Sequence, residues 1–538
     1  MLTKPQKAKF RAELFRHLDG IAMAPVAYSL HKHKLLDALL KEKRLSIRQL
    51  CDRFGANEGY LNVALHLLCG QGWLEQELDN GSDDIFYSTN DRSAIAFALC
   101  HLYEDVVALI QYSGQFHKRK FERKPFLMLE SIYDKCRRQY DLSPEVAPEV
   151  HAIQQQVLRH IEGMIVGPTT VALGMGGMFH KYFMEASFKA EEFHKDSDSF
   201  GRLLEIFVYL EWFEKKNNTY RFTDKGLFFA KRASAYGVTV SYIPTFRRMD
   251  DLLFGKPDLL WDVPAGSPEI HVDRAMNVWG SGGAHGTYFR KIDEAVISLF
   301  NRPIAEQPKG IVDMGCGNGA FLEHIFNVIA QRTRRGELLE EHPLFLVGAD
   351  FNQAALKATR ATLIQADIWA KVIWGDIGRP DLLADDLQEN YGIDLGDLLN
   401  VRTFLDHNRI WEDPAERSPD RLSTSSGAFA HRGRRIPNNA VEDNLLQHFR
   451  KWAPFVRKFG LLVIELHTIS PALIAENLGR TAATAYNATH GFSDQYILEI
   501  DNFLKVAAEA GLHPDPQHQS RFPKSELATV SINLLKGK

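Results

Sequence analysis

The sequence predicts an α/β protein whose C-terminal half, residues 271–538, forms a doubly wound, Rossmann-like core with a seven-stranded sheet. Three observations predict this core. An apolar run ends at Asp313 and leads through glycines into a helical pattern, and two further apolar runs end at Asp350 and Asp376. Buried strands that alternate with helices and end in polar turns are typical of parallel sheets covered on both faces.

The glycine-rich turn after Asp313 is the first candidate binding element. Glycines allow positive φ and let a ligand approach the main chain without a Cβ clash. The spacing is G-x-G-x-G, without the later glycine of the dinucleotide fingerprint, and the preceding carboxylate would repel a pyrophosphate. The same carboxylate would attract the cationic amino-acid end of S-adenosylmethionine. We therefore predict that Asp313, Gly315 and Gly317 contact this cofactor.

The next two strand ends extend the predicted cofactor site. Asp350 is placed to accept both ribose hydroxyls of an adenosine, with Phe351 beside it. Asp376 is placed to meet the adenine amino group, next to Ile377. Three acids at successive strand ends form a composite pattern that resembles class I S-adenosylmethionine-dependent methyltransferases.

Two positions outside these strand ends are added to the cofactor site. Residues 279–289 are dense in glycine and aromatic residues, and they directly precede the core. Such a segment can close over a cofactor, which makes Gly283 a candidate contact; otherwise it is a loop before the helix expected at 291–300. Asn400, on the fourth strand, is the last cofactor candidate.

Residues 1–150 predict a mostly helical, winged-helix-like domain. Helical patterns cover 45–55 and 57–69, and two short strands follow around an acidic turn. The second of these helices carries Glu58 but no lysine or arginine, whereas base and phosphate contacts need basic side chains. We therefore expect no nucleic-acid partner and a structural role, as a homodimer contact or as a lid over the acceptor site. Similar domains precede the core of small-molecule O-methyltransferases.

Residues 151–270 predict a second, degenerate winged-helix-like or lid domain that arose by internal duplication. Gly20 and Pro25 match Gly163 and Pro168, and the segment beginning Gly72-Trp-Leu-Glu matches Glu211-Trp-Phe-Glu. Two landmarks at nearly equal spacing indicate a repeat, although two copies are too few for a solenoid.

Composition limits the classes of protein and the cellular compartment that fit this sequence. Five cysteines occur without C-x-x-C spacing, so the sequence predicts neither a disulfide framework nor a structural zinc site. The net charge of −4 gives no general nucleic-acid surface. No apolar run reaches the ~20 residues of a membrane span. A cytoplasmic protein without a membrane partner is expected.

Polar residues follow the fourth and fifth strands, where acceptor chemistry is expected. Arg402, Asp406, His407 and His467 are the catalytic candidates. Two interpretations remain open. One histidine acts as a general base, or several of these groups hold one metal ion. Histidine with carboxylate or amide oxygens suits Fe or Mn rather than structural zinc.

The C-terminal half further resembles the C-methyltransferases of polyketide-synthase loading modules, including metal-dependent apratoxin-type and saxitoxin-type enzymes. The stretches that carry the resemblance are 278–289, 313–319, 400–409, 461–467 and 490–496. It implies methyl transfer from S-adenosylmethionine to the α-carbon of a malonyl-type thioester, with a metal that stabilises the enolate. It also implies His490 and Gln495 as metal ligands, with Asp406 or His407 as the third.

The resemblance also implies a partner, an acyl carrier protein whose phosphopantetheine holds the acyl group. This chain shows no carrier-protein motif, so we expect that partner to act in trans. A small-molecule O- or N-methyltransferase with His407 as general base is the alternative. A transcription regulator that only binds S-adenosylmethionine is a more distant one.

Overall fold

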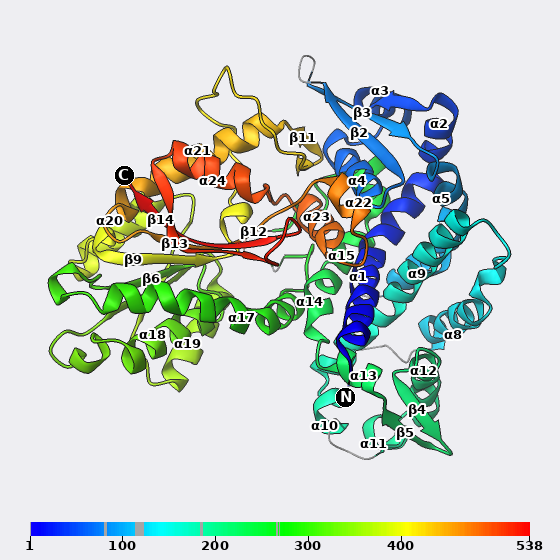
Figure 1. Cartoon of the computed structure of the whole chain (residues 1–538), viewed down its shortest axis with the longest axis horizontal. Coiled ribbons are helices and arrows are strands. Elements are labelled where there is room, and N and C mark those ends of the chain that lie inside the picture. The colour runs from blue at the N-terminus through cyan, green and yellow to red at the C-terminus, as the bar shows by residue number, and fades with distance from the viewer. Residues whose placement is uncertain (1, 80–82, 113–122, 183–186, 265–266, 268) are drawn as a thin grey trace. The chain divides into compact units, whose positions relative to one another are not determined.

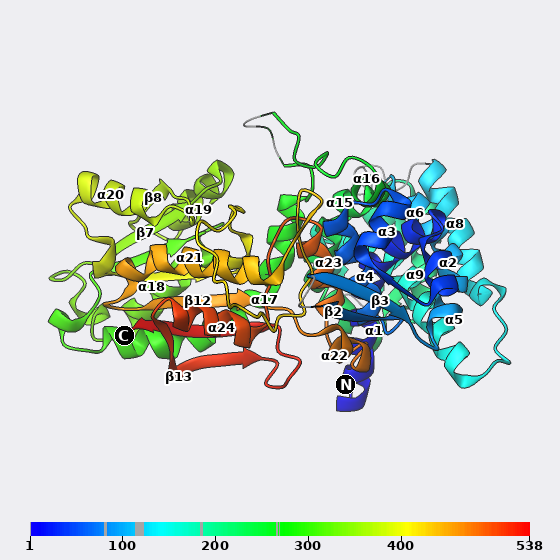
Figure 2. The same cartoon turned by 90° about the horizontal axis from the view of Figure 1, so that it is seen from above.

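The structure, a computed structural model, describes residues 2–79, 83–112, 123–182, 187–264, 267 and 269–538, without the side chains at 182 and 283–287. The chain forms two compact units (Figures 1 and 2). The first comprises 1–284 with 430–435 and 470–493, and the second comprises the rest. Two segments of the C-terminal half therefore fold with the N-terminal part.

The first unit begins with a long helix and a helix–hairpin motif. Helix α3 (Ile47–Phe54) starts at a capping box formed by Ser46 and Gln49, and it stops at Gly55, whose φ of 63° lies in the left-handed region. Three short strands form an antiparallel sheet in the order β1-β3-β2. These elements are the helices and hairpin expected of a winged-helix-like domain: α1 (Lys4–Lys32), α2 (Leu35–Glu42), β1 (Arg44–Ser46), α4 (Glu58–Gly70), β2 (Leu74–Asp79) and β3 (Asp84–Thr89).

A second set of similar elements follows in the same unit. It consists of α9 (Pro148–Met175), α12 (Ser197–Tyr209), the hairpin β4 (Phe213–Lys216) and β5 (Thr219–Phe222), and α13 (Asp224–Ala230). Helices α1 and α9 pack against each other (Figure 1). Their crossing is reciprocal. A Cβ on Gly20 would lie 2.3 Å from the Cα of His160, and a Cβ on Gly163 would lie 2.3 Å from the carbonyl oxygen of His17.

The remaining elements of the first unit are mostly short. Among the described residues, Ser93–Ile110 is long and apolar enough to cross a membrane, a test that core helices also pass. It includes α5 (Ser93–Leu99), η1 (Cys100–Tyr103) and α6 (Glu104–Ile110). The others are α8 (Arg123–Arg137), η3 (Gln139–Asp141), α10 (Met178–Tyr182), α11 (Ala190–Phe193), α14 (Ser234–Ser241), α15 (Ile243–Phe246), α16 (Met249–Phe254), α22 (Pro471–Glu476) and α23 (Ala483–Gly491).

The second unit contains the predicted seven-stranded sheet, in the order β13-β14-β12-β9-β6-β7-β8. The strands from β12 to β8 are parallel, and β14 runs antiparallel to both of its neighbours. The strand order reverses between β6 and β9, which is the switch point where open α/β sheets bind ligands. The strands are β6 (Gly310–Met314), β7 (Phe345–Asp350), β8 (Lys371–Trp374), β9 (Leu398–Thr403), β12 (Leu461–Leu466), β13 (Leu512–Phe522) and β14 (Val530–Gly537).

Helices cover both faces of this sheet. In Figure 1, α18 (Ala320–Arg332) and α19 (Gln353–Gln365) lie on one face, and α20 (Pro380–Tyr391), α21 (Asn438–Val456) and α24 (Ile500–Glu509) lie on the other. Every residue of β6 and β12 is buried, as expected for strands covered on two sides. The doubly wound, seven-stranded core predicted from the sequence is confirmed. Shorter elements of the second unit are η4 (Ile304–Glu306), η5 (Gly336–Leu338), η6 (Leu395–Asp397) and η7 (Asp406–Asn408). The strands β10 (Phe429–His431) and β11 (Arg434–Ile436) belong largely to the segment 430–435 of the first unit.

The alternative interpretation of residues 279–289 as a loop is wrong. A single helix, α17 (Arg274–Phe300), runs through this stretch. Gly280 serves close packing instead of a turn, because a Cβ there would lie 2.5 Å from the backbone nitrogen of Val238 on α14. Gly237 makes the reciprocal approach to the Cα of Gly280. Small residues on facing helices let two backbones come this close.

Candidate active site

The turn after β6 has the backbone that its glycines predict. Gly315, Gly317 and Gly319 have φ of 80°, 56° and 80°, all in the left-handed region. A Cβ on Gly315 would lie 2.7 Å from the Leu405 side chain. The amide of Gly317 donates to a carboxylate oxygen of Asp350 at 3.0 Å, so the ends of β6 and β7 are joined.

Asp313, at the end of β6, is a buried acid. It is 1% exposed, and neither carboxylate oxygen has a hydrogen-bond partner among the described residues. Burial and then the nearby charge of Asp350 raise the pKa of Asp313 to about 8. An orphaned buried carboxylate is costly unless a cation meets it. The ammonium group of S-adenosylmethionine would supply that cation, so the residues present fit this cofactor.

Three more predicted cofactor residues come directly after β7 and β8. Phe351 is largely exposed just after β7, and its ring centroid lies 5.7 Å from that of Trp374. Asp376 accepts a hydrogen bond from the amide of Gly378 at 2.8 Å, which fixes the turn after β8. Ile377 is buried, and its carbonyl oxygen accepts from the indole of Trp452 at 2.8 Å.

Two cofactor candidates lie elsewhere. The side-chain amide of Asn400 donates to the carbonyl oxygens of Leu395 and Leu398, at 3.3 and 3.2 Å. That contact holds the amide at the amino end of β9, whereas the other candidates of the sheet follow carboxyl ends. Gly283 belongs to α17 in the first unit, and its side-chain surroundings lie outside the described residues.

Arg402 and Asp406 form a buried ion pair where β9 ends. The Arg402 Nε lies 3.3 Å from one oxygen of Asp406, and His448 Nε2 lies 2.9 Å from the other. Burial alone would raise the pKa of Asp406, but Arg402 and His448 outweigh it and the pKa falls below its ordinary value. Burial lowers the pKa of His448 to about 4, so this histidine is neutral near pH 7. The guanidinium carbon of Arg402 also lies 4.6 Å from the centroid of the Trp452 ring.

His407 pairs with Glu465 in a buried dyad. Its Nδ1 lies 2.5 Å from one oxygen of Glu465, and its backbone amide donates to the other at 3.3 Å. Both side chains are buried. An ionised carboxylate only accepts, so Nδ1 carries the proton and Nε2 is the basic nitrogen. This is the arrangement of a general base, and also of a histidine that ligates a metal.

His467 has a structural environment. Its Nδ1 donates to the carbonyl oxygen of Leu498 at 3.1 Å, and its Nε2 accepts from the Ser531 hydroxyl at 2.8 Å. Burial lowers its pKa to about 3. Both ring nitrogens are thus engaged inside the sheet, and this geometry argues against the predicted catalytic role.

The predicted metal ligands are not assembled within one unit. His490 belongs to the first unit, where its Nδ1 lies 2.7 Å from the carbonyl oxygen of Tyr486. Gln495 and Asp406 belong to the second. Asp406 does not fit a ligand role, because one of its oxygens faces a guanidinium and the other faces His448. A divalent ion at that carboxylate would meet the charge of Arg402. Of the two residues predicted as the third ligand, His407 remains a candidate.

Sequence reasoning missed Glu465 and His448. Glu465 stands in an otherwise apolar strand, and a charged residue inside a buried strand is itself a signal of a buried partner. His448 lies in α21, a helix rich in buried polar side chains, and nothing in its own pattern marks it.

The sheet order with its reversed strand, the glycine turn and the acids at successive strand ends define a class I S-adenosylmethionine-dependent methyltransferase. Family models agree. They match the AprA N-terminal domain over residues 10–76, the AprA winged helix domain over 162–256 and the AprA MT2-like domain over 269–533. The chain belongs to this AprA-like methyltransferase family. The winged-helix model therefore falls on the segment predicted as the degenerate second copy.

Solved structures of methyltransferases are similar to this chain at low sequence identity. The mitomycin 7-O-methyltransferase MmcR is 11% identical, with a TM-score of 0.45, covering 72% of this chain and 98% of its own. The O-methyltransferase NcsB1 of neocarzinostatin biosynthesis is 15% identical, with a TM-score of 0.36, covering 70% and 96%. An O-methyltransferase family protein from Burkholderia thailandensis is 12% identical, with a TM-score of 0.38, covering 73% and 99%. A comparison with curated protein sequences gives no match.

Proposed function

We propose that this methyltransferase methylates the α-carbon of a malonyl-type thioester held by an acyl carrier protein that acts in trans. The observation that carries the proposal is the buried His407–Glu465 dyad after the fourth and fifth strands of the core. Membership of the AprA-like family supports it. The enzyme class removes the transcription-regulator alternative.

The dyad suits the removal of an acidic carbon-bound proton. His407 takes the proton from the α-carbon at Nε2, and Glu465 stabilises the imidazolium through Nδ1. S-adenosylmethionine, when bound, supplies the methyl group as an electrophile. The carbon–hydrogen electron pair becomes the new carbon–carbon bond, the sulfonium–methyl bond breaks, and S-adenosylhomocysteine leaves. The proton that remains on His407 then passes to solvent.

The acids of the glycine turn orient the cofactor in this proposal. Asp313 meets the ammonium group, and Asp350 holds the ribose hydroxyls while it fixes the Gly317 amide. Both carboxylates come from adjacent parallel strands whose carboxyl ends meet at one edge of the sheet. Orientation of this kind lowers the entropic part of the barrier to methyl transfer.

A bound Fe or Mn ion is an additional part of the proposal, and we derive no catalytic step from it. Asp406 does not fit as a ligand, which leaves His407 with His490 and Gln495. Metal analysis of the purified protein tests this set. Stoichiometric Fe or Mn that disappears in a Gln495→Ala variant supports the set, and a metal-free active enzyme excludes it.

The test of the acceptor is mass spectrometry of malonyl-carrier protein incubated with enzyme and S-adenosylmethionine. We expect the acyl group to gain one or two methyl groups. His407→Ala and Glu465→Gln should each lower turnover by roughly 10²- to 10⁴-fold, the range of a lost general base. His342→Ala, at an exposed histidine, is the control and should keep full turnover. If the enzyme methylates only hydroxyl or amine acceptors, and His407→Ala again loses turnover, the protein is a small-molecule O- or N-methyltransferase instead.

A further inference from the structure

The two copies in the first unit are more similar in sequence than their matching glycines alone indicate. Arg16-His17-Leu18-Asp19-Gly20 on α1 matches Arg159-His160-Ile161-Glu162-Gly163 on α9. His17 Nδ1 lies 2.8 Å from the hydroxyl of Tyr236, and His160 Nδ1 lies 2.8 Å from the hydroxyl of Tyr103. The two helices are therefore pseudo-equivalent, residue by residue, and their outer faces can be compared.

In the first copy, the chain itself covers this outer face. A Cβ on Gly479 would lie 3.1 Å from the Arg16 Nε and 3.3 Å from Ala12 on α1. Gln71, just after α4, donates to the hydroxyl of Thr484 at 2.9 Å. Both contacts come from the segment 470–493: Gly479 lies between α22 and α23, and Thr484 lies on α23.

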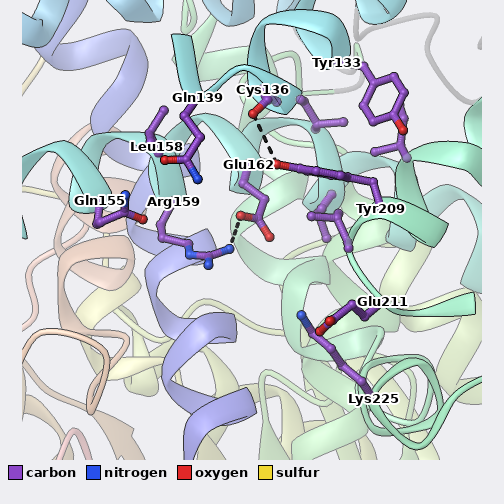
Figure 3. Close-up of a pocket in the computed structure, with 14 residues that line it drawn as sticks. Tyr133, Cys136, Gln139, Gln155, Leu158, Arg159, Glu162, Tyr209, Glu211 and Lys225 are labelled. Carbon is purple, nitrogen blue, oxygen red and sulfur yellow. Dashed lines mark hydrogen bonds and ion pairs between the residues drawn. The ribbon is translucent and has the colours of Figure 1, made fainter. Parts of the chain in front are cut away.

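In the second copy, the equivalent face lines a pocket of about 250 Å³ (Figure 3). Arg159 and Glu162 of α9, the counterparts of Arg16 and Asp19, line it. Leu210 and Glu211, the counterparts of Gln71 and Gly72, also line it. Helix α8 and η3 close the other side through Tyr133, Cys136 and Gln139. Where the first copy holds a segment of the chain, the second holds an open space.

The charged groups distinguish this pocket from its counterpart. Glu162 pairs with Arg159, and one of its oxygens lies 3.2 Å from Nε2 of His17. Lys225 pairs with Glu13 at 2.7 Å. Burial would raise the pKa of Glu162, but His17, Arg159 and Lys225 outweigh it and lower the pKa to about 2, so the carboxylate stays ionised. The residue of α9 that corresponds to Glu13 of α1 is the neutral Gln156, so the first copy has no equivalent of the Lys225–Glu13 pair there.

Glu211 adds a second acid and a strained backbone. Its φ is 63°, in the left-handed region, and its counterpart Gly72 has φ of 74°. Glycine adopts this conformation without strain, whereas glutamate does not. Strained residues cluster at functional sites, where the surrounding structure holds them for a purpose. Glu211 lines the pocket and is exposed, so its carboxylate is accessible to a ligand that enters from solvent.

A metal ion fits the same region less well. Ligand atoms of Glu13, His17 and Glu162 lie within 4.8 Å of one another. Each of the two carboxylates already faces a cation, Lys225 or Arg159, so the group is neutral without an ion. A bare divalent charge would have to displace both cations.

We propose that this pocket binds a small zwitterion, an α-amino acid with an apolar side chain. The lining carries two cations, Arg159 and Lys225, and two carboxylates, Glu162 and Glu211, which favours a ligand that carries both signs and no net charge. The ammonium group faces Glu211, and the carboxylate faces Lys225, which also keeps its ion pair with the buried Glu13. The side chain lies against an apolar wall that includes Leu158, Ile206 and Leu210.

The test is calorimetry of the full chain with L-leucine, N-acetyl-L-leucine and L-leucinamide. Leucine should bind, and each derivative, which lacks one of the two charges, should bind at least about tenfold more weakly. L-Phenylalanine, L-aspartate and L-lysine complete the panel, and the two charged side chains should bind worst. Absence of binding by leucine and phenylalanine, or equal binding by the blocked derivatives, would overturn the proposal.

Variants locate the binding. Glu211→Gln should weaken leucine binding by at least about tenfold, while Glu214→Gln, at an exposed glutamate on the adjoining strand, should leave it unchanged. Both substitutions are at exposed positions, and retained affinity for S-adenosylmethionine shows that each variant is folded. Unchanged leucine affinity in Glu211→Gln would place any amino-acid site elsewhere and refute the assignment to this pocket.

Discussion

Asp313 carries a prediction that links stability to cofactor binding. Its carboxyl is 1% exposed, and its pKa rises from an ordinary 3.8 to about 8. Between these two values the folded chain binds a proton that the unfolded chain has released, so stability falls as pH rises from 4 to 8 and levels off above 8. A shift of about four pKa units corresponds to about 5 kcal/mol at pH 9. Asp313→Asn removes this cost, and the cofactor-free variant should be more stable than the parent at high pH.

The same substitution should impair cofactor binding. The ammonium group of S-adenosylmethionine favours the ionised form of Asp313, so binding near pH 7 expels a proton. The dissociation constant of the parent should therefore fall by up to about tenfold per pH unit as pH rises toward 8. In Asp313→Asn this pH dependence should vanish, and affinity at pH 8 should be lower than in the parent.

Two measurements check both parts. Urea denaturation of cofactor-free protein from pH 5 to pH 9 gives the stability slope, and Asn318→Asp, which adds a carboxylate in the same turn, serves as a control for nonspecific charge effects. Calorimetry in buffers of different ionisation enthalpy counts the proton released on binding. Parallel stability curves for parent and Asp313→Asn would refute the buried-acid argument. Binding without proton release would refute its link to the ammonium group.

Further predictions concern the cofactor, the helix crossing and the oligomeric state. Asp350→Ala should weaken S-adenosylmethionine binding by roughly 1.5–3 kcal/mol for each lost charge-assisted hydrogen bond, and unchanged calorimetric affinity would remove Asp350 from the site. Gly163→Ala should lower the unfolding free energy by about 1–3 kcal/mol, because its Cβ would lie 2.3 Å from the backbone of His17. Gly282→Ala, at a helical position where nothing in the described part of the chain lies within 4 Å of an added Cβ, should instead be neutral or stabilising by up to about 1 kcal/mol. Similar melting of the two variants would contradict the crossing geometry. Light scattering should show a homodimer, and a monomer at micromolar concentration would exclude it.

Much of the core was predictable because its signals are local. Each apolar run that ends in an acid is a strand whose carboxyl end must carry that acid to one edge of the sheet, so Asp313, Asp350 and Asp376 needed no tertiary information. Strand β13 gave no such signal. It contains Pro514 and Pro516 and alternates polar residues, which an edge strand tolerates.

The site itself was less predictable because pairing across strands is not local. His407 and Glu465 are brought together only by the parallel neighbours β9 and β12. Asn400 lies on the fourth core strand, as a cofactor contact would, but its side chain turns toward η6. Gly280 on α17 shows the same limit, because a glycine that lets two helices approach cannot be told from a loop glycine by composition.

The return of residues 430–435 and 470–493 to the first unit affects any attempt to cut this enzyme into modules. Arg435 pairs with Glu58 and Asp83, both at 2.8 Å, and a Cβ on Gly491 would lie 2.7 Å from Val63. A fragment that begins at residue 271 would expose these surfaces and leave α22 and α23 without their packing partners. When this methyltransferase is recombined with other biosynthetic enzymes, the N-terminal region and the core should therefore be transferred together.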